Sequence, residues 1–274
     1  MPKLAPDRYR VRPGKPFRLA QVDPADDGGW SKEEANTALK PLQDRFAKLT
    51  ENLYAEHARS LLVVLQGMDA AGKDSTVRHV FSPLDPASCH VRAFKAPHHE
   101  EASHDFLWRI HHFVPSAGHV GIFNRSHYED AVIAKINRLV PPAKLAHRIR
   151  HIRAFEDLLT TEGTVVVKFF LHISKDHQKE RLMKRLRDPA KRWKFDPTDI
   201  QERKRWPVYM KTYSDIMRQT AAADAPWYAI PAQHRPYRNL LITQVLVDIL
   251  EKLDPKPRRM SFSQSKMLRE LETE

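Results

Sequence analysis

The sequence predicts an α/β fold in which a mainly parallel sheet is covered by helices on both faces. Three observations support this class. Short apolar runs alternate with helical patterns along most of the 274 residues. The Leu- and Val-rich run at residues 61–66 is typical of a buried parallel strand, and residues 164–173 (TVVVKFFLHI) form the clearest strand. Between residues 61 and 76, LLVVLQGMDAAGKDST passes from a strand through a glycine-bounded loop into a helix.

The remaining elements follow from local patterns. Residues 1–30 contain several prolines and predict an irregular arm. Ser31 and Glu34 form a capping-box pattern before a helix that reaches about residue 57, in which Pro41 is a candidate kink. Further strands are expected at residues 90–94, 119–123 and 227–230, and further helices at residues 73–81, 100–114, 126–139, 142–161, 174–187, 199–220 and 237–253. The chain therefore divides into an arm and helix (1–57) packed on a core domain (58–254), with a polar tail (255–274).

Composition narrows the class of protein. Hydrophobic residues make up 41% and charged residues 29%, which is typical of a soluble globular protein. Neither a membrane span nor a secretory signal is recognisable, so we expect no membrane partner. The single cysteine, Cys89, excludes an intrachain disulfide and fits a cytoplasmic location. The formal net charge of +12 indicates either a merely basic surface or a polyanionic partner: nucleic acid, an anionic membrane or a phosphate-rich substrate.

Residues 67–73 match the pattern G-x-x-x-x-G-K of a phosphate-binding loop (P-loop). Such a loop follows a strand and opens a helix, so that its backbone N–H groups cradle phosphate oxygens at the positive end of the helix dipole. The alternative is a tight turn with a surface lysine, and the strand and helix on either side disfavour it. The candidate phosphate-binding residues are Gly67, Met68, Asp69, Ala70, Ala71, Gly72, Lys73, Asp74 and Ser75.

Asp74 occupies the position where such loops usually carry a Ser or Thr hydroxyl that binds Mg²⁺. Asp69 adds a carboxylate inside the loop, and carboxylate oxygens are hard ligands suited to Mg²⁺. We therefore expect Asp69 to bind the metal or orient the acceptor, with Mg²⁺ as the cofactor and Mn²⁺ as a possible substitute. The alternative is a loop cap in which Asp69 bonds its own backbone.

A second group of candidates follows the strands at residues 119–123 and 90–94. Asn124 and Arg125 fall beyond a strand's carboxyl end, where functional residues of parallel sheets gather. The guanidinium of Arg125 suits phosphate recognition, and Glu129 lies about a turn and a half into the next helix. Alternatively, Asn124 caps that helix and Arg125 forms a surface ion pair. Lys95 is a candidate phosphate contact on the acceptor side.

Basic residues outnumber acidic ones between residues 175 and 211. Arg181 and Arg185 share one helix face, and Arg192 and Lys194 lie in a basic loop with aromatic residues. Together with the phosphate-binding loop, this pattern favours a lid at about residues 181–205 that closes over phosphates. The alternative is a solvated charged face. The chain's 15 histidines match no zinc-binding spacing, and we expect them to be structural or surface residues.

The ordered set of motifs resembles the polyphosphate kinase 2 family. The matching pieces are GMDAAGKDST (67–76), FKAP (94–97), DFLWR (105–109), IFNRSHYED (122–130), KFFLHIS (168–174), RLMKRLRDPAKRWKF (181–195) and APWYAIPA (225–232). The resemblance implies a three-layer P-loop kinase fold, thymidylate-kinase-like, with a helical basic lid. It also implies Mg²⁺-dependent transfer of a terminal phosphoryl group from inorganic polyphosphate to AMP, ADP or other nucleotides by a homo-oligomer.

The same resemblance implies roles for individual residues. Asp69, Lys73, Arg125 and Glu129 are the expected catalytic residues, and Arg181, Arg185, Arg192 and Lys194 are expected to hold polyphosphate. Lys95, Asn124 and Arg125 are expected on the acceptor nucleotide. The second motif commonly begins with Asp, whereas this chain has Asn124, and Glu129 stands where relatives have Asn. This combination resembles the class III subgroup, which phosphorylates both AMP and ADP.

Two other functions stay open at the level of sequence. An ATP-dependent nucleoside monophosphate kinase would share the fold but would not need so basic a lid. A nucleotide-switched nucleic-acid-binding protein would bind RNA or DNA with strong salt dependence, yet no nucleic-acid-binding motif is recognisable, so we expect no nucleic-acid partner. A catalytically inactive relative is disfavoured because Asp69, Lys73 and Arg125 are all present.

Overall fold

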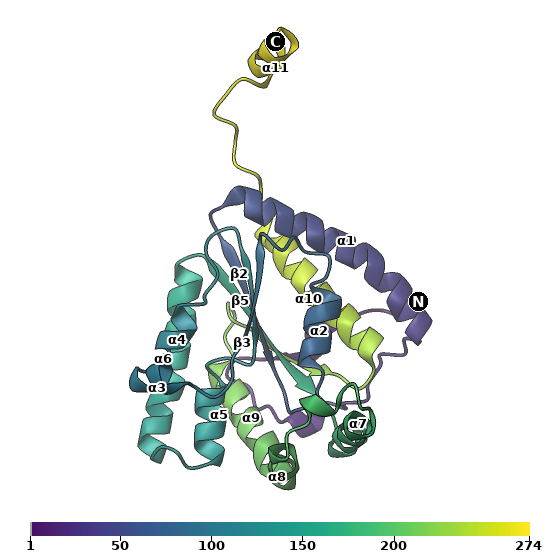
Figure 1. Ribbon diagram of the computed structural model, residues 1–274, viewed down its shortest axis with the longest axis vertical. Helices are drawn as coiled ribbons and strands as arrows, with labels where there is room; N and C mark the ends of the chain where they lie inside the picture. The colour runs from purple at the N-terminus through teal and green to yellow at the C-terminus, as the bar shows by residue number, and fades with distance from the viewer. Residues whose placement is uncertain (1) are drawn as a thin grey trace.

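The computed structural model describes residues 2–274, which form one six-stranded sheet flanked by helices (Figure 1). The strand order is β1-β6-β5-β2-β4-β3. β1 runs antiparallel to β6, and all other neighbours are parallel, so the predicted mainly parallel α/β class is confirmed. The strands are β1 (Arg10–Val11), β2 (Ser60–Gln66), β3 (Cys89–Ala93), β4 (Val120–Asn124), β5 (Thr164–His172) and β6 (Trp227–Pro231).

Helices cover both faces of the sheet. In Figure 1, α1, α2 and α10 lie on one side and α5, α6 and α9 on the other, while α7 and α8 lie beyond the carboxyl ends of the strands. The helices are α1 (Lys32–Glu56), α2 (Lys73–Val80), α3 (His99–Ser103), α4 (Trp108–His111), α5 (Glu129–Ile136), α6 (Pro142–Thr161), α7 (Lys175–Arg187), α8 (Thr198–Lys204), α9 (Trp206–Thr220), α10 (Arg235–Leu253) and α11 (Gln264–Glu272). Three short 3₁₀ turns are η1 (Pro6–Tyr9), η2 (Leu19–Gln21) and η3 (Arg192–Lys194).

Strand β2 is apolar at every position from Leu61 to Leu65. Leu61, Val63 and Leu65 belong to the hydrophobic cluster that packs under α1, α2 and α10. Leu62 and Val64 belong to the opposite cluster, under α5, α6 and α9. Successive side chains of a strand point to opposite faces, so a strand covered by helices on both sides carries a continuous apolar run. The loop that follows β2 is therefore anchored to the most rigid part of the fold.

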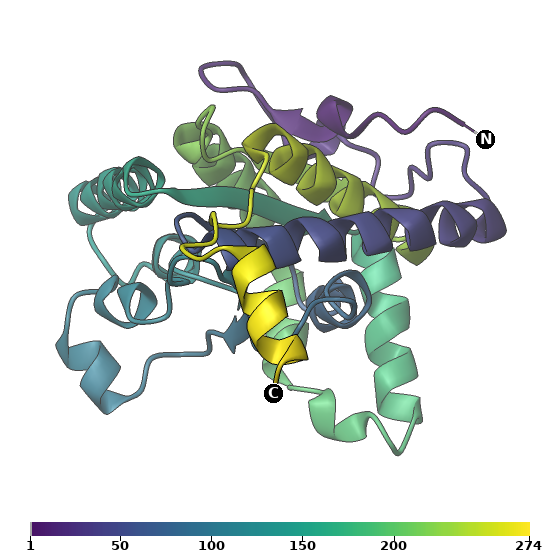
Figure 2. The ribbon, with the colours of Figure 1, turned by 90° about the horizontal axis from the view of Figure 1, so that it is seen from above.

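The long first helix forms as its cap predicts. Ser31 Oγ accepts a hydrogen bond from the Glu34 N–H at 3.1 Å, and the Glu34 carboxylate accepts one from the Ser31 N–H at 3.0 Å. This reciprocal pair satisfies two backbone donors that the helix cannot satisfy itself. The helix continues through Pro41 to Glu56, so the expected kink does not divide it. Figure 2 shows α1 lying beside α10.

Several expected boundaries were wrong. The predicted helix at residues 100–114 is two short helices, α3 and α4. The predicted helix at residues 199–220 is divided at Arg205, because Pro207 occupies the first turn of α9 and cannot donate the hydrogen bond that would join it to α8. The helix expected at residues 126–139 is shorter and covers Glu129–Ile136.

The two ends of the chain hold elements that the sequence did not predict. The N-terminal arm supplies β1, whose Arg10 pairs with Tyr228 of β6 and so covers that edge of the sheet. The tail contains α11, which Figure 1 shows extending away from the body. Among the helices of residues 2–274, none is both long enough and apolar enough to cross a membrane.

His172 provides a test of the buried core at the end of β5. Its side chain is 7% exposed, and burial lowers the pKa of the imidazole to about 4. Between pH 6.5 and about 4, the unfolded chain binds a proton here that the folded chain does not, so stability falls as the pH falls through this window. We expect His172→Gln to remove about 2 kcal/mol of that acid-dependent loss between pH 7 and pH 5.

The measurement is the free energy of unfolding at pH 7 and pH 5. The exposed His151 provides the control, because His151→Gln removes a histidine that is already solvated. An identical pH dependence in wild type and His172→Gln would contradict the prediction.

Candidate active site

The predicted phosphate-binding loop connects the carboxyl end of β2 to the first turn of α2. Gly67 has φ +148°, and a Cβ there would lie 2.8 Å from the carbonyl oxygen of Leu171, so only glycine fits. Ala70 adopts a left-handed conformation with φ 63°, which a non-glycine residue holds only when its surroundings demand it. Gly72, with φ +104°, caps α2. The loop thus places the free N–H groups of a helix N-terminus at the sheet edge, where they can bind an anion.

Lys73 is the first residue of α2, and its side chain is folded back into the loop. It is 8% exposed, and its Nζ donates to the carbonyl oxygens of Gly67 at 2.7 Å and Met68 at 3.2 Å. Burial and the positive charge of Arg125 together lower the pKa of Lys73 to about 8, against the opposing effect of Asp69. The amine is therefore largely protonated at neutral pH and can neutralise phosphate charge.

Three predicted catalytic residues come together beside the loop. Arg125, which follows β4, forms ion pairs with Asp69 and with Glu129, the latter at 3.3 Å. Burial would raise the pKa of Asp69, but the positive charges of Lys73 and Arg125 outweigh it and hold that pKa below its usual value. Glu129 and Asp69 raise the pKa of Arg125 against the effect of burial. Asp69 and Arg125 are therefore both charged at neutral pH. Arg125 is held in a left-handed backbone conformation with φ 63°.

The two unusual positions of the motifs contact each other. Asn124 Nδ2 donates to the carboxylate of Asp74 at 2.7 Å. A carboxylate at position 124 would instead face that of Asp74 at hydrogen-bonding distance, which like charges disfavour. The amide at position 124 thus accommodates Asp74. Asp74 is thus held next to Asn124, which was predicted to contact the acceptor.

The predicted lid, at about residues 181–205, covers the second half of α7 together with η3 and α8. Arg185 ties it together by donating to the carbonyl oxygen of Lys194 at 3.0 Å and by pairing with Asp199 at 3.6 Å. Arg192 and Lys194 lie on the exposed η3 turn. The Lys194 amine lies 5.0 Å from the ring centroid of Trp193, whose side chain is 77% exposed. Arg185 therefore organises the lid, whereas Arg192 and Lys194 are presented to solvent, where a polyanion could reach them.

Some residues that join the lid to the loop were missed by sequence reasoning. Gln178 of α7 donates to the backbone oxygen of Asp69 at 3.0 Å and accepts from Arg203 at 3.1 Å. Burial and the neighbouring Asp69 carboxylate raise the pKa of Asp199 to about 6. No local pattern marks Gln178 or Asp199 as site residues, because their contact with the loop depends on how α7 and α8 fold over the sheet.

Lys95 follows β3, and its neighbour Phe94 donates a backbone hydrogen bond to Asn124 at 3.0 Å. Lys95 thus lies at the same sheet edge, although within residues 2–274 its side chain makes no hydrogen bond with the phosphate-binding loop. In the same part of the chain, no group of three or more His, Cys, Asp or Glu side chains forms a metal-binding cluster.

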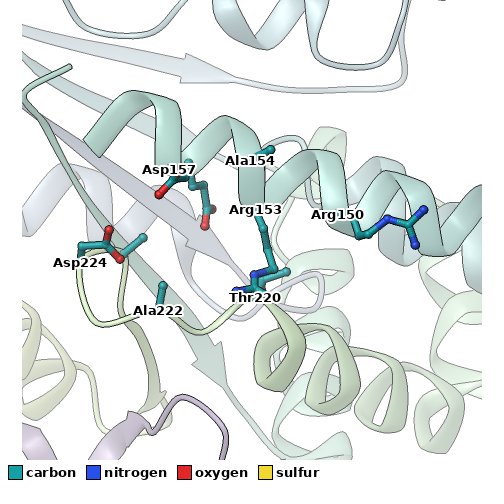
Figure 3. Close-up of a pocket in the computed structure, with 9 residues that line it drawn as sticks. Arg150, Arg153, Ala154, Asp157, Thr220, Ala222 and Asp224 are labelled. Carbon is teal, nitrogen blue, oxygen red and sulfur yellow. The ribbon is translucent and has the colours of Figure 1, made fainter. Parts of the chain in front are cut away.

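The structure also has a hollow away from these residues. About 510 Å³ in volume, it lies between α6 and the segment that follows α9, where Figure 3 shows Arg153, Asp157 and Asp224 around it. Its wall residue Glu156 pairs with the buried Lys168. None of the candidate residues of the phosphate-binding loop lines this hollow.

A double substitution tests the exposed part of the lid. We expect Arg192→Ala together with Lys194→Ala to raise the KM for a polyphosphate donor roughly tenfold, because two solvent-facing cations are removed, and to leave the acceptor KM within about twofold. Initial rates at varied donor and acceptor concentration measure both constants. The matched control is Lys252→Ala with Arg269→Ala, two cations at the far end of the chain. An unchanged donor KM in the lid variant would rule out this role.

A strand, a P-loop, a helix and a basic helical lid at one sheet edge define a P-loop phosphotransferase. The family model of polyphosphate kinase 2 matches residues 29–258. The chain therefore belongs to the polyphosphate kinase 2 family, as the motifs predicted.

Similar proteins extend over nearly the whole chain. The AMP/ADP-polyphosphate phosphotransferase of Meiothermus ruber is 46% identical over 259 residues, covering 93% of this chain and 97% of the relative. The ADP-polyphosphate phosphotransferase of Rhodopseudomonas palustris is 37% identical over 260 residues, covering 87% and 90%. The crystal structure of polyphosphate kinase 2 from Arthrobacter aurescens TC1 superposes with a TM-score of 0.94 at 40% identity and covers 98% of this chain and 97% of that one.

Proposed function

We propose that this protein transfers the terminal phosphoryl group of inorganic polyphosphate to AMP and to ADP. The observation that carries the proposal is the convergence of Lys73, Arg125 and Asp69 on a P-loop that a basic lid faces. The 46% identity to the M. ruber enzyme supports the same donor and acceptors. A phosphate polymer also accounts for a net charge of +12 without a nucleic-acid partner.

The residues suggest how the transfer proceeds. The donor chain lies along the lid, and the N–H groups of the loop and the amine of Lys73 hold its terminal phosphate. Arg125 neutralises the equatorial charge that spreads over the transferring group. Its ion pairs with Asp69 and Glu129 fix the direction of the guanidinium before substrate arrives. No covalent intermediate is required, because positioning and charge neutralisation supply most of the catalysis in phosphoryl transfer.

Asp69 is the residue that we propose to hold Mg²⁺. Mg²⁺ is commonly bound through one or two carboxylates, with substrate phosphates and water completing its octahedron, so a site with a single protein carboxylate fits this ion. The pKa of Asp69 is lowered, so its oxygens are available as ligands at neutral pH. When bound, the ion neutralises negative charge on the phosphate oxygens. The other carboxylate of the loop, Asp74, accepts a hydrogen bond from the Asn124 amide, and the comparison of Asp69→Asn with Asp74→Asn distinguishes the two.

One experiment tests the function. The purified protein is incubated with Mg²⁺, polyphosphate and, separately, AMP, ADP, GMP or GDP, and the products are resolved by chromatography. We expect ADP from AMP and ATP from ADP. A parallel reaction with ATP as the donor tests the alternative of an ATP-dependent nucleoside monophosphate kinase: transfer from ATP but not from polyphosphate would support that alternative and overturn the proposal.

We further propose that the protein works in the cytoplasm as a homo-oligomer. Its nucleotide acceptors are found there, and its free thiol, Cys89, stays reduced there. The exposed apolar side chains of the tail, which include Phe262 and Leu271, favour burial against another chain. Light scattering on the assayed preparation tests the assembly, and a monomeric mass would exclude it.

A further inference from the structure

Arg238, on α10, carries a buried positive charge that lacks a counter-charge. Its side chain is 0% exposed. Nε and Nη2 donate to Asn239 Oδ1 at 3.1 and 2.8 Å, and Nη2 also reaches Ser75 Oγ at 3.3 Å. Within residues 2–274, Nη1 has no hydrogen-bond partner and no carboxylate forms an ion pair with this guanidinium. A buried charge in such a state is unfavourable unless something else compensates it.

The unpartnered Nη1 points at the phosphate-binding loop. A Cβ added to Gly72 would lie 2.4 Å from Nη1, which is one reason that this position is glycine. Gly72 caps α2, and Ser75 lies in its first turn. The guanidinium thus lies directly behind the helix N-terminus, where it adds to the positive potential that attracts anions.

Two more arginines surround Arg238. Burial, and to a smaller extent the positive charges of Arg181 and Arg235, lower the pKa of Arg238 to about 9. Nε of Arg181 is also buried without a hydrogen-bond partner in the described chain. Arg181 lies one turn after Gln178, which donates to the backbone of Asp69, so this face of α7 is turned toward the loop. We name Arg181, Arg235 and Arg238 the arginine cluster.

The strand order places the arginine cluster on one side of the loop. β5 and β6 lie on one side of β2, and they lead into α7 and α10, which carry the cluster. β4 and β3 lie on the other side and lead to Asn124 and Lys95, the candidates for the acceptor. A ligand bound at the cluster is therefore separated from the acceptor by the loop itself.

We propose that the arginine cluster binds the phosphate chain of the polyphosphate donor, with Arg238 as the buried positioning residue behind the loop and Arg181 and Arg235 along the chain. This inference rests on the proposed function. A phosphate polymer supplies the several negative charges that three neighbouring guanidinium groups require, whereas AMP supplies a single phosphate group. Arg238 lies against the loop at Gly72 and Ser75. The negative charge of the bound donor then compensates the positive charge of its guanidinium.

The test compares Arg238→Met with Arg218→Met, which removes an equal charge from the exposed surface of α9 on the opposite face of the sheet. The measured quantities are the KM for polyphosphate, the KM for AMP, and the Tm with and without polyphosphate. We expect Arg238→Met to raise the polyphosphate KM at least about tenfold, to leave the AMP KM within about twofold, and to reduce the rise in Tm caused by polyphosphate.

The ligand-free Tm separates this role from a structural one. Because Arg238→Met removes an uncompensated buried charge, we expect that Tm to stay unchanged or rise, whereas a structural arginine would lower it when lost. If Arg238→Met keeps the wild-type KM for polyphosphate and the wild-type rise in Tm on adding polyphosphate, the inference is overturned, whatever its ligand-free Tm. If Arg238→Met does not fold, Arg235→Met at the exposed start of α10 decides by the same criteria. Absence of any transfer by the wild type would overturn the proposed function instead.

Discussion

Replacing Lys73 with alanine is expected to lower kcat by at least about a thousandfold while the protein stays folded. The Lys73 amine is buried in the loop, 2.7 Å from the Gly67 oxygen, and is the cation at the start of α2. Without it, the charge that develops on the transferring phosphoryl group loses a neutralising partner inside a water-poor loop. Arg125 keeps its pairing with Asp69 and Glu129, so it cannot take the place of the amine.

The measurements are kcat with polyphosphate and AMP, and Tm. Arg78→Ala is the matched control, because Arg78 is an exposed cation in the last turn of the same helix. We expect it to retain wild-type kcat. The Lys73→Ala variant is expected to keep a Tm within a few degrees of wild type, since the loss of two hydrogen bonds is offset by removal of a buried charge. Wild-type transfer by a folded Lys73→Ala protein would exclude the assigned site.

The second large effect is expected from Asp69→Asn, which should lower kcat roughly a hundredfold and raise the Mg²⁺ concentration needed for half-maximal rate. Asparagine keeps the shape of the side chain but removes the charge that binds the ion and pairs with Arg125. Because Lys73 and Arg125 hold the pKa of Asp69 below its usual value, the wild-type residue is ionised across the neutral range, so the substitution removes a full charge.

Asp74→Asn is the informative comparison, since it makes the same chemical change at the position where a metal-binding hydroxyl usually stands. Its carboxylate is exposed and accepts from Asn124, and we expect the Mg²⁺ requirement to stay within about twofold of wild type. Titration of Mn²⁺ into each ligand-free variant, followed by electron paramagnetic resonance, measures metal binding without turnover. If Asp74→Asn weakened Mn²⁺ binding and Asp69→Asn did not, the metal would have to be assigned to Asp74.

Prediction from sequence succeeded where the signal is local. The capping box at Ser31 and Glu34, the apolar run of β2 and the P-loop pattern each reflect interactions within a few residues or one element. It failed where distant packing decides. The two-residue strand β1 exists because it adds to the edge of β6, more than 200 residues away, and no periodicity can appear in so short a strand.

The site itself divides in the same way. Lys73 and Asp69 belong to one contiguous loop, so the pattern identified them together. Gln178 and Arg238 reach that loop from α7 and α10, and nothing in their own sequence neighbourhoods distinguishes a buried arginine from the many solvated ones in this basic chain. The ordered motifs indicated the family, yet they did not show that Asn124 and Asp74 are hydrogen-bonded partners.

The sequence by itself determined the α/β class, the phosphate-binding loop and the family, because strand burial and loop conformation depend on neighbouring residues and on the period of the side chains. Only the tertiary structure decided which cations surround that loop and which of them lack a counter-charge. That outcome depends on the strand order β6-β5-β2-β4, which sets α7 and α10 on one side of the loop and Asn124 on the other. Strand order follows from long-range packing of the whole sheet, and the hydrophobic pattern of a single strand carries no record of its neighbours.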